Sequence, residues 1–411
     1  MKTISHYLFN HEIRANASKS DAQRCLILAA FSSGISRIHG LDESEDVLSM
    51  KRCLSEIGAE FHGTNPTKVI PIQKENKKAL VLNVGESGFA LRTIAFMSLL
   101  CSEDVSLNGT GTLHQREQHQ LITILKQLGL QVDSNEGKLP LHIRGKIGVS
   151  EISVDGSEGS QAISGLCLLA PHLPNGLQVH LEKLKSKPYL ALTLQRMRTT
   201  GIRIDEISSD TFFISNQSSY HSNAYQIEGD WSGAANFIVG ASISGSIRIT
   251  GLQATSMQAD RSIMDFIQSF GAKAHWEDKV LCISQAETKR TFQVTITDCP
   301  DLFPILVILA CSVHGTSIIR GVERLKNKES DRLLVMCKLL DTFGVNHELH
   351  SNELQIHGTG KILGGMIQTH HDHRIAMAAS IAGCLSQNDI ILSDEHCVAK
   401  SYPNFFNDLG N

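Results

Sequence analysis

At 411 residues, the chain is long enough for two or three domains of average size. Its formal net charge of −4 offers no overall electrostatic attraction to nucleic acid. The ten cysteines are scattered singly, and the longest apolar run, Leu302 to Val313, is too short to cross a bilayer. We therefore expect a cytoplasmic protein with reduced thiols that binds neither nucleic acid nor membrane.

A helix that ends at a glycine and leads into a strand recurs about every 70 residues along the chain. The first copy reads Ile57-Gly58-Ala59, and the fifth reads Phe343-Gly344-Val345. The glycines that end the six helices are Gly58, Gly129, Gly201, Gly271, Gly344 and Gly410.

A second helix, polar or glycine-rich at its start and apolar in its body, recurs with the same spacing. The repeating unit is therefore helix, strand, helix, strand and a further strand, which predicts a compact α/β module. Six such modules in two groups of three account for the length of the chain. The second helices begin near Ser20, Gly88, Ser160, Ser232, Asp301 and Asp372.

Basic side chains collect at the starts of the expected helices. A helix start carries unpaired backbone N–H groups and about half a positive charge, which favours a bound anion. If these starts converge, the chain binds small molecules that carry phosphate and carboxylate groups. The basic residues are Lys19, Arg116, Lys187, Lys328, Arg332, Arg374 and Lys400.

The first module opens with Ser18-Lys19-Ser20, and Arg24 follows one turn into the helix. Together these side chains suit a phosphate, although an ordinary capped surface helix explains them equally well. The next module has a glycine-rich turn at Gly88, whose backbone N–H groups favour close approach of a ligand. The third module offers two hydroxyl-rich helix starts, at Ser160-Gln161 and at residues 186–189, and both phosphate binding and plain capping remain open there.

In the second half of the chain, Asp301 opens an otherwise apolar helix, either as its cap or as an acid–base group. The run Lys328-Glu329-Ser330-Asp331-Arg332 is interpreted as the first turn of an amphipathic helix. Its two cations then lie on one face and repel each other unless an anion binds between them. Asp260 is interpreted as a helix cap rather than a catalyst.

The run His370-His371-Asp372-His373 suggests a metal site, but its spacing matches no helical pair of histidine ligands. Cys397, near the last helix, is interpreted as a small buried residue because no base is visible near it. No metal site is therefore predicted from this run.

Taken together and in this order, these motifs resemble the 5-enolpyruvylshikimate-3-phosphate synthase family of enolpyruvyl transferases (3-phosphoshikimate 1-carboxyvinyltransferases). The resemblance covers essentially the whole chain. Its most specific parts are Ser186-Lys187-Pro188-Tyr189 and the run from Lys328 to Arg332.

The resemblance implies a two-lobed inside-out α/β barrel with six βαβαββ repeats, three in each lobe. Residues 1–16 and 229–411 are expected to form one lobe, which includes the N-terminal strand and repeats four to six. Residues 17–228 are expected to form the other lobe, with repeats one to three.

The implied reaction transfers the enolpyruvyl group of phosphoenolpyruvate to the 5-hydroxyl of shikimate 3-phosphate and releases phosphate. It proceeds by addition and elimination through a tetrahedral intermediate, in the biosynthesis of chorismate and the aromatic amino acids. The implied partners are these two small molecules and, as an inhibitor, glyphosate. The resemblance also implies that the reaction needs no metal and no organic cofactor, and a monomer is expected.

The resemblance also implies roles for individual residues. Asp301 is the candidate base for the 5-hydroxyl, and Glu329, with Lys400 or Lys19, is the candidate for proton transfer at the methylene carbon. The residues expected to bind shikimate 3-phosphate are Lys19, Ser20, Arg24, Ser160, Gln161, Ser186, Tyr189, Asp301 and Lys328. Those expected to bind phosphoenolpyruvate are Lys19, Gly88, Arg116, Gln161, Arg332, Arg374 and Lys400.

Several positions depart from the family pattern. Glu86 and Phe89 stand in the glycine-rich turn where the family commonly has Asn and Thr, and Arg324 replaces an asparagine. A negative charge and a bulky ring at these positions suggest altered phosphoenolpyruvate affinity and altered glyphosate sensitivity.

Two alternatives remain at this stage. One is the sister enzyme that transfers enolpyruvyl to UDP-N-acetylglucosamine, which typically carries a reactive cysteine in the loop that here runs from Gly109 to Arg116 without one. The other is a non-catalytic homologue that binds metabolites.

Overall fold

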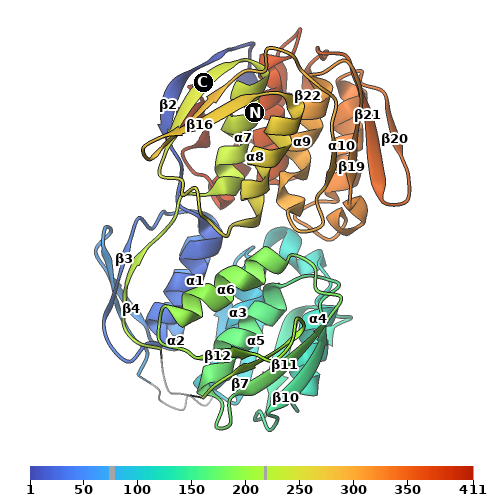
Figure 1. Cartoon of the computed structure of the whole chain (residues 1–411). Coiled ribbons are helices and arrows are strands. Elements are labelled where there is room, and N and C mark those ends of the chain that lie inside the picture. The colour runs from blue at the N-terminus through green and yellow to red at the C-terminus, as the bar shows by residue number, and fades with distance from the viewer. Residues whose placement is uncertain (74–78, 217–219, 411) are drawn as a thin grey trace. The chain divides into compact units, whose positions relative to one another are not determined.

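The computed structural model describes residues 1–73, 79–216 and 220–410, and the chain divides into two compact units (Figure 1). Unit 1 comprises Met1–Ser18 and Glu228–Asn411, and unit 2 comprises Lys19–Ile227. The chain therefore starts in unit 1, enters unit 2 after Ser18 and returns at Glu228.

Each unit has an inner set of three helices, which are buried on nearly all sides because their bodies are mostly apolar or small and their few charged side chains lie near their starts. In unit 2 the inner helices are α1 (Lys19–Ala30), α3 (Gly88–Met97) and α5 (Gln161–Leu169). In unit 1 they are α7 (Trp231–Ile243), α9 (Phe303–Cys311) and α11 (His373–Ile381), which contact one another.

A second helix of each repeat buries one face and exposes the other. These helices are α2 (Glu45–Ile57), α4 (His119–Gln127), α6 (Lys187–Arg198), α8 (Ile263–Phe270), α10 (Arg332–Thr342) and α12 (Phe405–Leu409). The chain also forms short 3₁₀ helices, and those near the candidate site are η2 (Gly111–Gln115), η4 (Ala259–Ser262), η5 (Pro300–Leu302), η6 (Val322–Leu325) and η8 (His396–Lys400).

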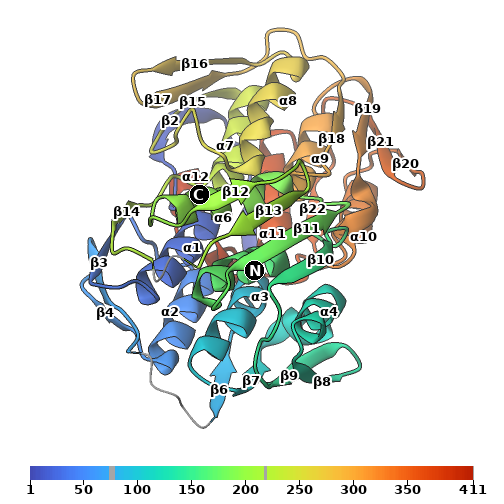
Figure 2. The ribbon, with the colours of Figure 1, turned by 60° about the horizontal axis from the view of Figure 1, so that its bottom comes forward.

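In unit 2 the strands form three four-stranded sheets outside the inner helices (Figures 1 and 2). The first is ordered β14 (Ala224–Gln226), β3 (Ser36–His39), β5 (Thr67–Ile70), β4 (Glu60–His62). The second is ordered β6 (Leu80–Asn83), β7 (Asp104–Asn108), β9 (Lys138–Arg144), β8 (Gln131–Asn135). The third is ordered β10 (Glu151–Asp155), β11 (Leu177–Glu182), β13 (Thr211–Ile214), β12 (Ile204–Glu206).

Unit 1 repeats this plan. Two sheets are ordered β2 (Phe9–Arg14), β15 (Gly245–Thr250), β17 (Val280–Ser284), β16 (Lys273–Glu277) and β18 (Gln293–Thr295), β19 (Gly315–Arg320), β21 (Glu353–Gly358), β20 (His347–Leu349). The third is ordered β1 (Lys2–Ile4), β23 (Ile390–Leu392), β22 (Gly365–Ile367). Each sheet contains one parallel pair, and its remaining pairs are antiparallel. An inner helix connects the parallel strands β6 and β7, β10 and β11, β18 and β19, and β22 and β23, whereas the pairs β3–β14 and β2–β15 join strands that are distant in sequence.

The six glycines that the sequence placed at helix ends all have positive φ, between 70° and 129°. Each follows one of the partly exposed helices, where a side chain would be strained. The predicted α/β repeat is therefore confirmed at the residues that defined it.

Several predicted boundaries are wrong. The expected single N-terminal strand within residues 1–16 is two strands, β1 and β2. Helix α10 begins at Arg332, because the Asp331 side chain accepts a hydrogen bond from the backbone N–H of Leu334 at 3.1 Å and caps the helix there. Lys328 and Glu329 therefore lie in the preceding loop and do not share a helix face with Arg332.

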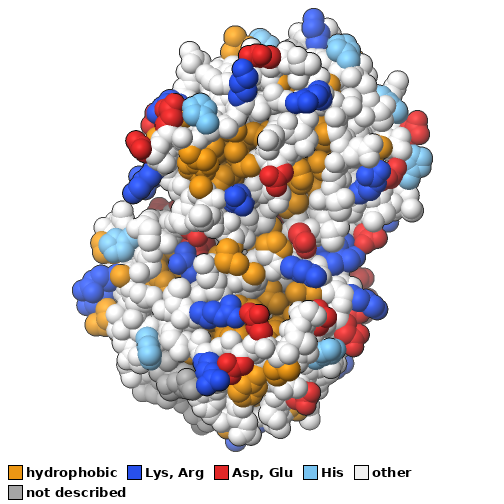
Figure 3. Space-filling model, in the orientation of Figure 1, with side chains coloured by type: hydrophobic (Ala, Val, Ile, Leu, Met, Phe, Trp, Pro, Cys, Tyr) orange, Lys and Arg blue, Asp and Glu red, His pale blue; other side chains and the backbone are white. Residues whose placement is uncertain are grey.

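Charged side chains of both signs are interspersed over the visible face of each unit, as the small net charge implies (Figure 3). Among the described residues, none of the helices combines the length and the apolar character needed to cross a membrane.

Candidate active site

In unit 2, the side chain of Arg24 is buried and held from several directions. Its Nε donates to Thr193 Oγ1 at 2.7 Å, its Nη1 to the carbonyl of Ser20 at 2.6 Å, and its Nη2 to the carbonyl of Tyr189 at 3.0 Å. The guanidinium also lies over the ring of Phe89, 4.4 Å from the centroid. Burial lowers the pKa of Arg24 to about 10, so the group remains charged at neutral pH. The structure thus joins the starts of α1, α3 and α6 around one cation.

A second cluster in unit 2 surrounds Gly88, at the start of α3. A β-carbon at this position would lie 2.8 Å from Nη1 of Arg92, 3.5 Å from Nη1 of Arg116 and 3.7 Å from Oε1 of Gln161. Arg92 donates to Gln161 Oε1 at 2.8 Å and so links α3 to α5. Three of the predicted phosphoenolpyruvate ligands, Gly88, Arg116 and Gln161, therefore lie together, and a larger residue at position 88 would displace the Arg92 side chain.

The loop that carries Arg116 is ordered by Glu86. The Glu86 carboxylate accepts a hydrogen bond from the backbone N–H of Thr112 at 2.6 Å, and Arg116 Nη2 donates to Thr112 Oγ1 at 2.9 Å. Arg116 lies between η2 and α4 rather than inside a helix, because the chain there forms a 3₁₀ turn. Its Nε is buried and has no hydrogen-bond partner. Glu86, which departs from the family pattern, is thus a structural partner of this loop.

The remaining predicted residues of unit 2 also lie at helix starts. Lys19 forms an ion pair with Asp46, at the start of α2, at 2.9 Å. Ser160 precedes α5 without a side-chain capping bond, and Ser186 precedes α6 in the left-handed conformation with φ of 58°.

In unit 1, Arg332 is the centre of the site. Its side chain is 1% exposed and donates to Asp301 at 2.7 Å, to Glu329 at 2.7 Å and to Asp372 at 2.8 Å. Burial by itself lowers the pKa of Arg332, but the three carboxylates outweigh it and hold that pKa well above its usual value. The predicted anion ligand is therefore saturated by acidic side chains of the protein.

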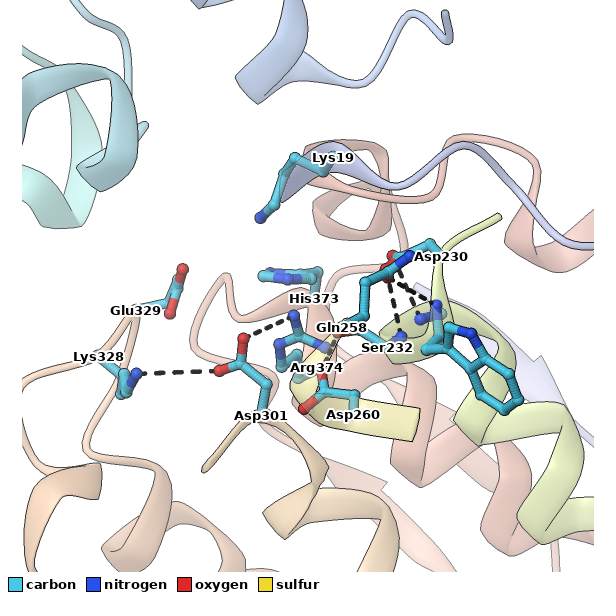
Figure 4. A network of polar contacts seen from close by, with 12 residues as sticks. Lys19, Asp230, Ser232, Gln258, Asp260, Asp301, Lys328, Glu329, His373 and Arg374 are labelled. Atoms are coloured by element: carbon cyan, nitrogen blue, oxygen red, sulfur yellow. Dashed lines mark hydrogen bonds and ion pairs between the residues drawn. The ribbon is translucent and has the colours of Figure 1, made fainter. Parts of the chain in front are cut away.

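One of the two interpretations of Asp301 expected it to cap its helix. The carboxylate does not do so, because it is directed at cations. It accepts hydrogen bonds from Arg332 at 2.7 Å and Arg374 at 2.9 Å, and Lys328 Nζ lies 3.9 Å away (Figure 4). Burial raises the pKa of Asp301, but these three charges reverse the effect and hold it below its usual value. Burial lowers the pKa of Lys328 to about 8.

Asp372, which sequence reasoning did not assign to the site, fixes the geometry of α10 and α11 together. Its buried carboxylate accepts from Arg332, from Ser330 Oγ at 3.0 Å and from the backbone N–H of Arg374 at 3.0 Å. In the sequence it stood out as a polar helix start and as part of the histidine run that was considered as a metal site. Lys400, at the end of η8, is 2% exposed and does not open α12 as predicted, because a turn separates the two elements.

Within the described ranges, one group of side chains offers three metal-ligand atoms within 4.8 Å of one another: His275, Glu277 and Cys282. Arg248 Nη1 contacts Glu277 at 2.6 Å and Cys282 Sγ at 3.3 Å, so a cation of the protein already occupies this group. The run from His370 to His373 forms no such group, and His371 instead contacts Asp394 at 2.8 Å.

The family model described as EPSP synthase (3-phosphoshikimate 1-carboxyvinyltransferase) matches residues 7–409 of this chain. The chain belongs to the EPSP synthase family. Among its relatives, the 3-phosphoshikimate 1-carboxyvinyltransferase of Clostridium novyi is 32% identical over 413 residues, covering 97% of this chain and 94% of that protein. The corresponding protein of Erwinia tasmaniensis is 31% identical over 412 residues, covering 98% and 96%.

Solved structures agree on the fold. The EPSP synthase of Acinetobacter baumannii superposes with a TM-score of 0.82 at 23% identity, covering 99% of this chain and 97% of that chain. The enolpyruvyl transferase NikO of Streptomyces tendae superposes with a TM-score of 0.75 at 15% identity, covering 99% and 96%. The predicted two-lobed inside-out α/β fold is confirmed.

Membership of the EPSP synthase family also confirms the predicted enzyme class, a transferase of the shikimate pathway. The family's reaction is the predicted enolpyruvyl transfer, and its substrates are phosphoenolpyruvate and shikimate 3-phosphate. The UDP-N-acetylglucosamine alternative and the non-catalytic alternative are not favoured by these matches.

Proposed function

We propose that this chain transfers the enolpyruvyl group of phosphoenolpyruvate to the 5-hydroxyl of shikimate 3-phosphate through the residues described above. The observation that carries the proposal is the cluster in unit 1 in which Asp301 contacts Arg332 and Arg374 and lies 3.9 Å from Lys328. Such a cluster places an ionised carboxylate among cations that suit anionic substrates.

Shikimate 3-phosphate is bound mainly by the helix starts of unit 2 in this proposal. The rigid Arg24 supplies a fixed positive charge, and the half-buried Ser20 and Tyr189 lie beside it. Backbone N–H groups at the starts of α5 and α6 add hydrogen-bond donors for a phosphate. The full set is Lys19, Ser20, Arg24, Ser160, Gln161, Ser186, Tyr189, Asp301 and Lys328.

Phosphoenolpyruvate carries a phosphate and a carboxylate, and the proposed ligands are correspondingly basic. Gly88 leaves room for its close approach to the backbone, and the unpartnered Nε of Arg116 supplies a donor. At Arg332, the carboxylate of the substrate replaces one of the protein carboxylates, and Glu329 is the more exposed of the two partners on its Nη2. The full set is Lys19, Gly88, Arg116, Gln161, Arg332, Arg374 and Lys400.

Release of Glu329 from Arg332 then gives the reaction its proton carrier. Glu329, with Lys400 or Lys19, delivers a proton to the methylene carbon and later removes one from the methyl group. Asp301 accepts the proton of the 5-hydroxyl as that oxygen attacks the neighbouring carbon, and phosphate leaves in the elimination step. Both steps lead through the tetrahedral intermediate, and the surrounding cations stabilise its negative charge.

We further propose that residues 1–16 and 229–411 form one lobe and that residues 17–228 form the other. The chain acts as a monomer in the cytoplasm, and glyphosate inhibits it by competing with phosphoenolpyruvate.

The test is phosphate release from phosphoenolpyruvate with the purified full-length chain. Release that depends on shikimate 3-phosphate, together with formation of the enol ether, supports the proposal. Release that depends on UDP-N-acetylglucosamine instead would identify the sister enzyme. Binding of both substrates without any release would identify a non-catalytic homologue.

A further inference from the structure

A buried carboxylate that none of the proposed roles uses lies beside the Asp301–Arg374 ion pair (Figure 4). Asp260, in η4, is 0% exposed and accepts a hydrogen bond from the hydroxyl of Ser232, at the start of α7. A carboxylate that is withdrawn completely from water is costly unless nearby charges or a proton compensate for it.

The groups that face Asp260 come from three elements around it. From the start of α7 come Asp230 and Ser232, from the η5 region come Cys299 and Asp301, and from α11 comes Arg374. Arg374 is the one cation in this set, and its Nη2 already donates to Asp301 at 2.9 Å. Asp260 and Asp301 therefore share one guanidinium, an arrangement in which two carboxylates titrate as a pair.

The electrostatic balance places this titration near neutral pH. Burial is the largest cause that raises the pKa of Asp260 to about 6, and the negative charge of Asp301 adds to it. Arg374 and the hydrogen bond from Ser232 oppose the rise. Ligand-free protein therefore carries a mixture of protonated and ionised Asp260 at about pH 6.

We propose that Asp260 is a positioning residue for Arg374 that takes up a proton from solvent when an anion binds to this arginine. The inference rests on the proposed function, in which Arg374 binds phosphoenolpyruvate. A bound anion forms an ion pair with Arg374, which weakens the attraction between Arg374 and Asp260. The anion also adds negative charge near Asp260. Protonation of Asp260 offsets one of the negative charges that the ligand brings and leaves Arg374 to the ligand and Asp301.

The sign of the pH dependence follows from linkage. Below about pH 5, Asp260 is already protonated in free and bound protein, so binding takes up no proton there. Above the free pKa, binding requires uptake, and affinity for phosphoenolpyruvate weakens with rising pH by at most about tenfold per pH unit. The proton uptake is largest just above pH 6.

The experiment measures phosphoenolpyruvate binding to the full-length chain with shikimate 3-phosphate present, by calorimetry in buffers of different ionisation enthalpy. We compare the wild type with Asp260→Asn, whose amide oxygen still accepts the bond from Ser232. We expect the variant to take up several tenths of a proton less at about pH 6.5, with no difference at about pH 5. Its KM for phosphoenolpyruvate should be several-fold lower than that of the wild type at about pH 8.

Two further variants keep the test decisive. Ser232→Ala removes a hydrogen bond that favours ionised Asp260, so it should move the uptake to higher pH, and it carries the test if Asp260→Asn does not fold. Asp265→Asn removes an exposed carboxylate from the neighbouring helix α8 and should leave the profile unchanged. Lys328 and the phosphate group of the substrate also titrate in this range. They do so in the wild type and in all three variants, so they cancel in the comparison.

The same proton uptake in Asp260→Asn as in an active wild type would overturn the inference. A KM raised equally at every pH would also overturn it, because that result describes a merely structural carboxylate. Absence of any phosphate release by the wild type would instead overturn the proposed function.

Discussion

Arg332 shows how single side chains set the chemistry of unit 1. Its guanidinium is neutralised by Asp301, Glu329 and Asp372, and its burial makes loss of any of these partners expensive. Asp372 also caps α11, so it cannot be exchanged without disturbing the helix. Glu329, in a loop and 15% exposed, is the partner that an incoming anion displaces at least cost.

We predict that Glu329→Gln keeps substrate binding and lowers kcat by roughly 10²- to 10⁴-fold, the range for loss of general acid–base catalysis. The amide retains the shape and one acceptor for Arg332 but cannot carry the proton. Steady-state kinetics and direct binding of each substrate provide the measurement. Glu323→Gln, at an exposed position in η6, is the matched control, and near-normal turnover in Glu329→Gln would refute the role.

Phe89 contacts Arg24, since its ring covers that guanidinium at 4.4 Å. Phe89→Leu removes a cation–π contact worth about 0.5–2 kcal/mol, so we predict a roughly 2- to 30-fold loss of affinity for shikimate 3-phosphate. Phe89→Tyr keeps the ring and should bind normally. Calorimetric titration checks this, and a change confined to phosphoenolpyruvate affinity would contradict it.

At the scale of elements, helices α3 and α5 of unit 2 pack closely against each other. A β-carbon on Gly165 of α5 would overlap the carbonyl of Arg92 and lie 2.6 Å from Cδ2 of Phe96 and 3.0 Å from Cα of Thr93. The two helices therefore approach each other along their backbones. This approach sets the bond between Arg92 and Gln161, which lies next to Gly88.

We predict that Gly165→Ala lowers the free energy of unfolding by about 1–3 kcal/mol, the usual cost of overpacking, and weakens phosphoenolpyruvate binding. The added methyl group pushes α3 from α5 and separates Arg92 from Gln161. Chemical denaturation and substrate titration measure the two effects. Gly148→Ala, at a position with no atom within 4 Å of the new β-carbon, is the control and should change neither quantity.

The repeat was predictable from sequence because its signals are local: a glycine such as Gly129 must take positive φ wherever a helix ends in this way. The helix starts were predictable to within a few residues for the same reason. The exact start of α10 was not, since Asp331 and the run before it are all compatible with a first turn. The partners of Arg332 could not be predicted from the sequence, because Asp301 and Asp372 are 31 and 40 residues away along the chain and approach it only through tertiary folding.

Asp260 shows the same limit of sequence-based prediction, here for a residue that was interpreted as structural. Its sequence context shows an acid at the start of a helix, which usually means a cap. Only the packing of α7, η5 and α11 removes it from water and places it near a second carboxylate. Candidate ligands were thus readable from residue type, whereas the charge state of the cluster required the fold.

At the scale of the whole molecule, the N-terminal strands complete unit 1 although the chain then leaves it. Strand β2 pairs in parallel with β15, and β1 pairs antiparallel with β23. The strand that completes the corresponding sheet of unit 2 is β14, which pairs in parallel with β3 just before the chain returns to unit 1. Each unit is therefore completed by a strand that lies next to a point where the chain passes between the units, and β1 and β2 belong to the sheets of unit 1.

We predict that Phe9→Ala destabilises unit 1 by about 3–5 kcal/mol, the usual cost of removing a buried aromatic ring. Phe9 is 1% exposed, its ring lies against Gly240 of α7, and it meets Phe237 edge-on at 6.5 Å. Hydrogen exchange should rise in α7 and β15 while α3 and α5 of unit 2 keep their protection. Leu8→Ala, at a side chain that is 66% exposed, should leave both units unchanged. Equal loss of protection in the two units would show instead that they unfold as one cooperative body, in which the N-terminal strand stabilises unit 2 as strongly as unit 1.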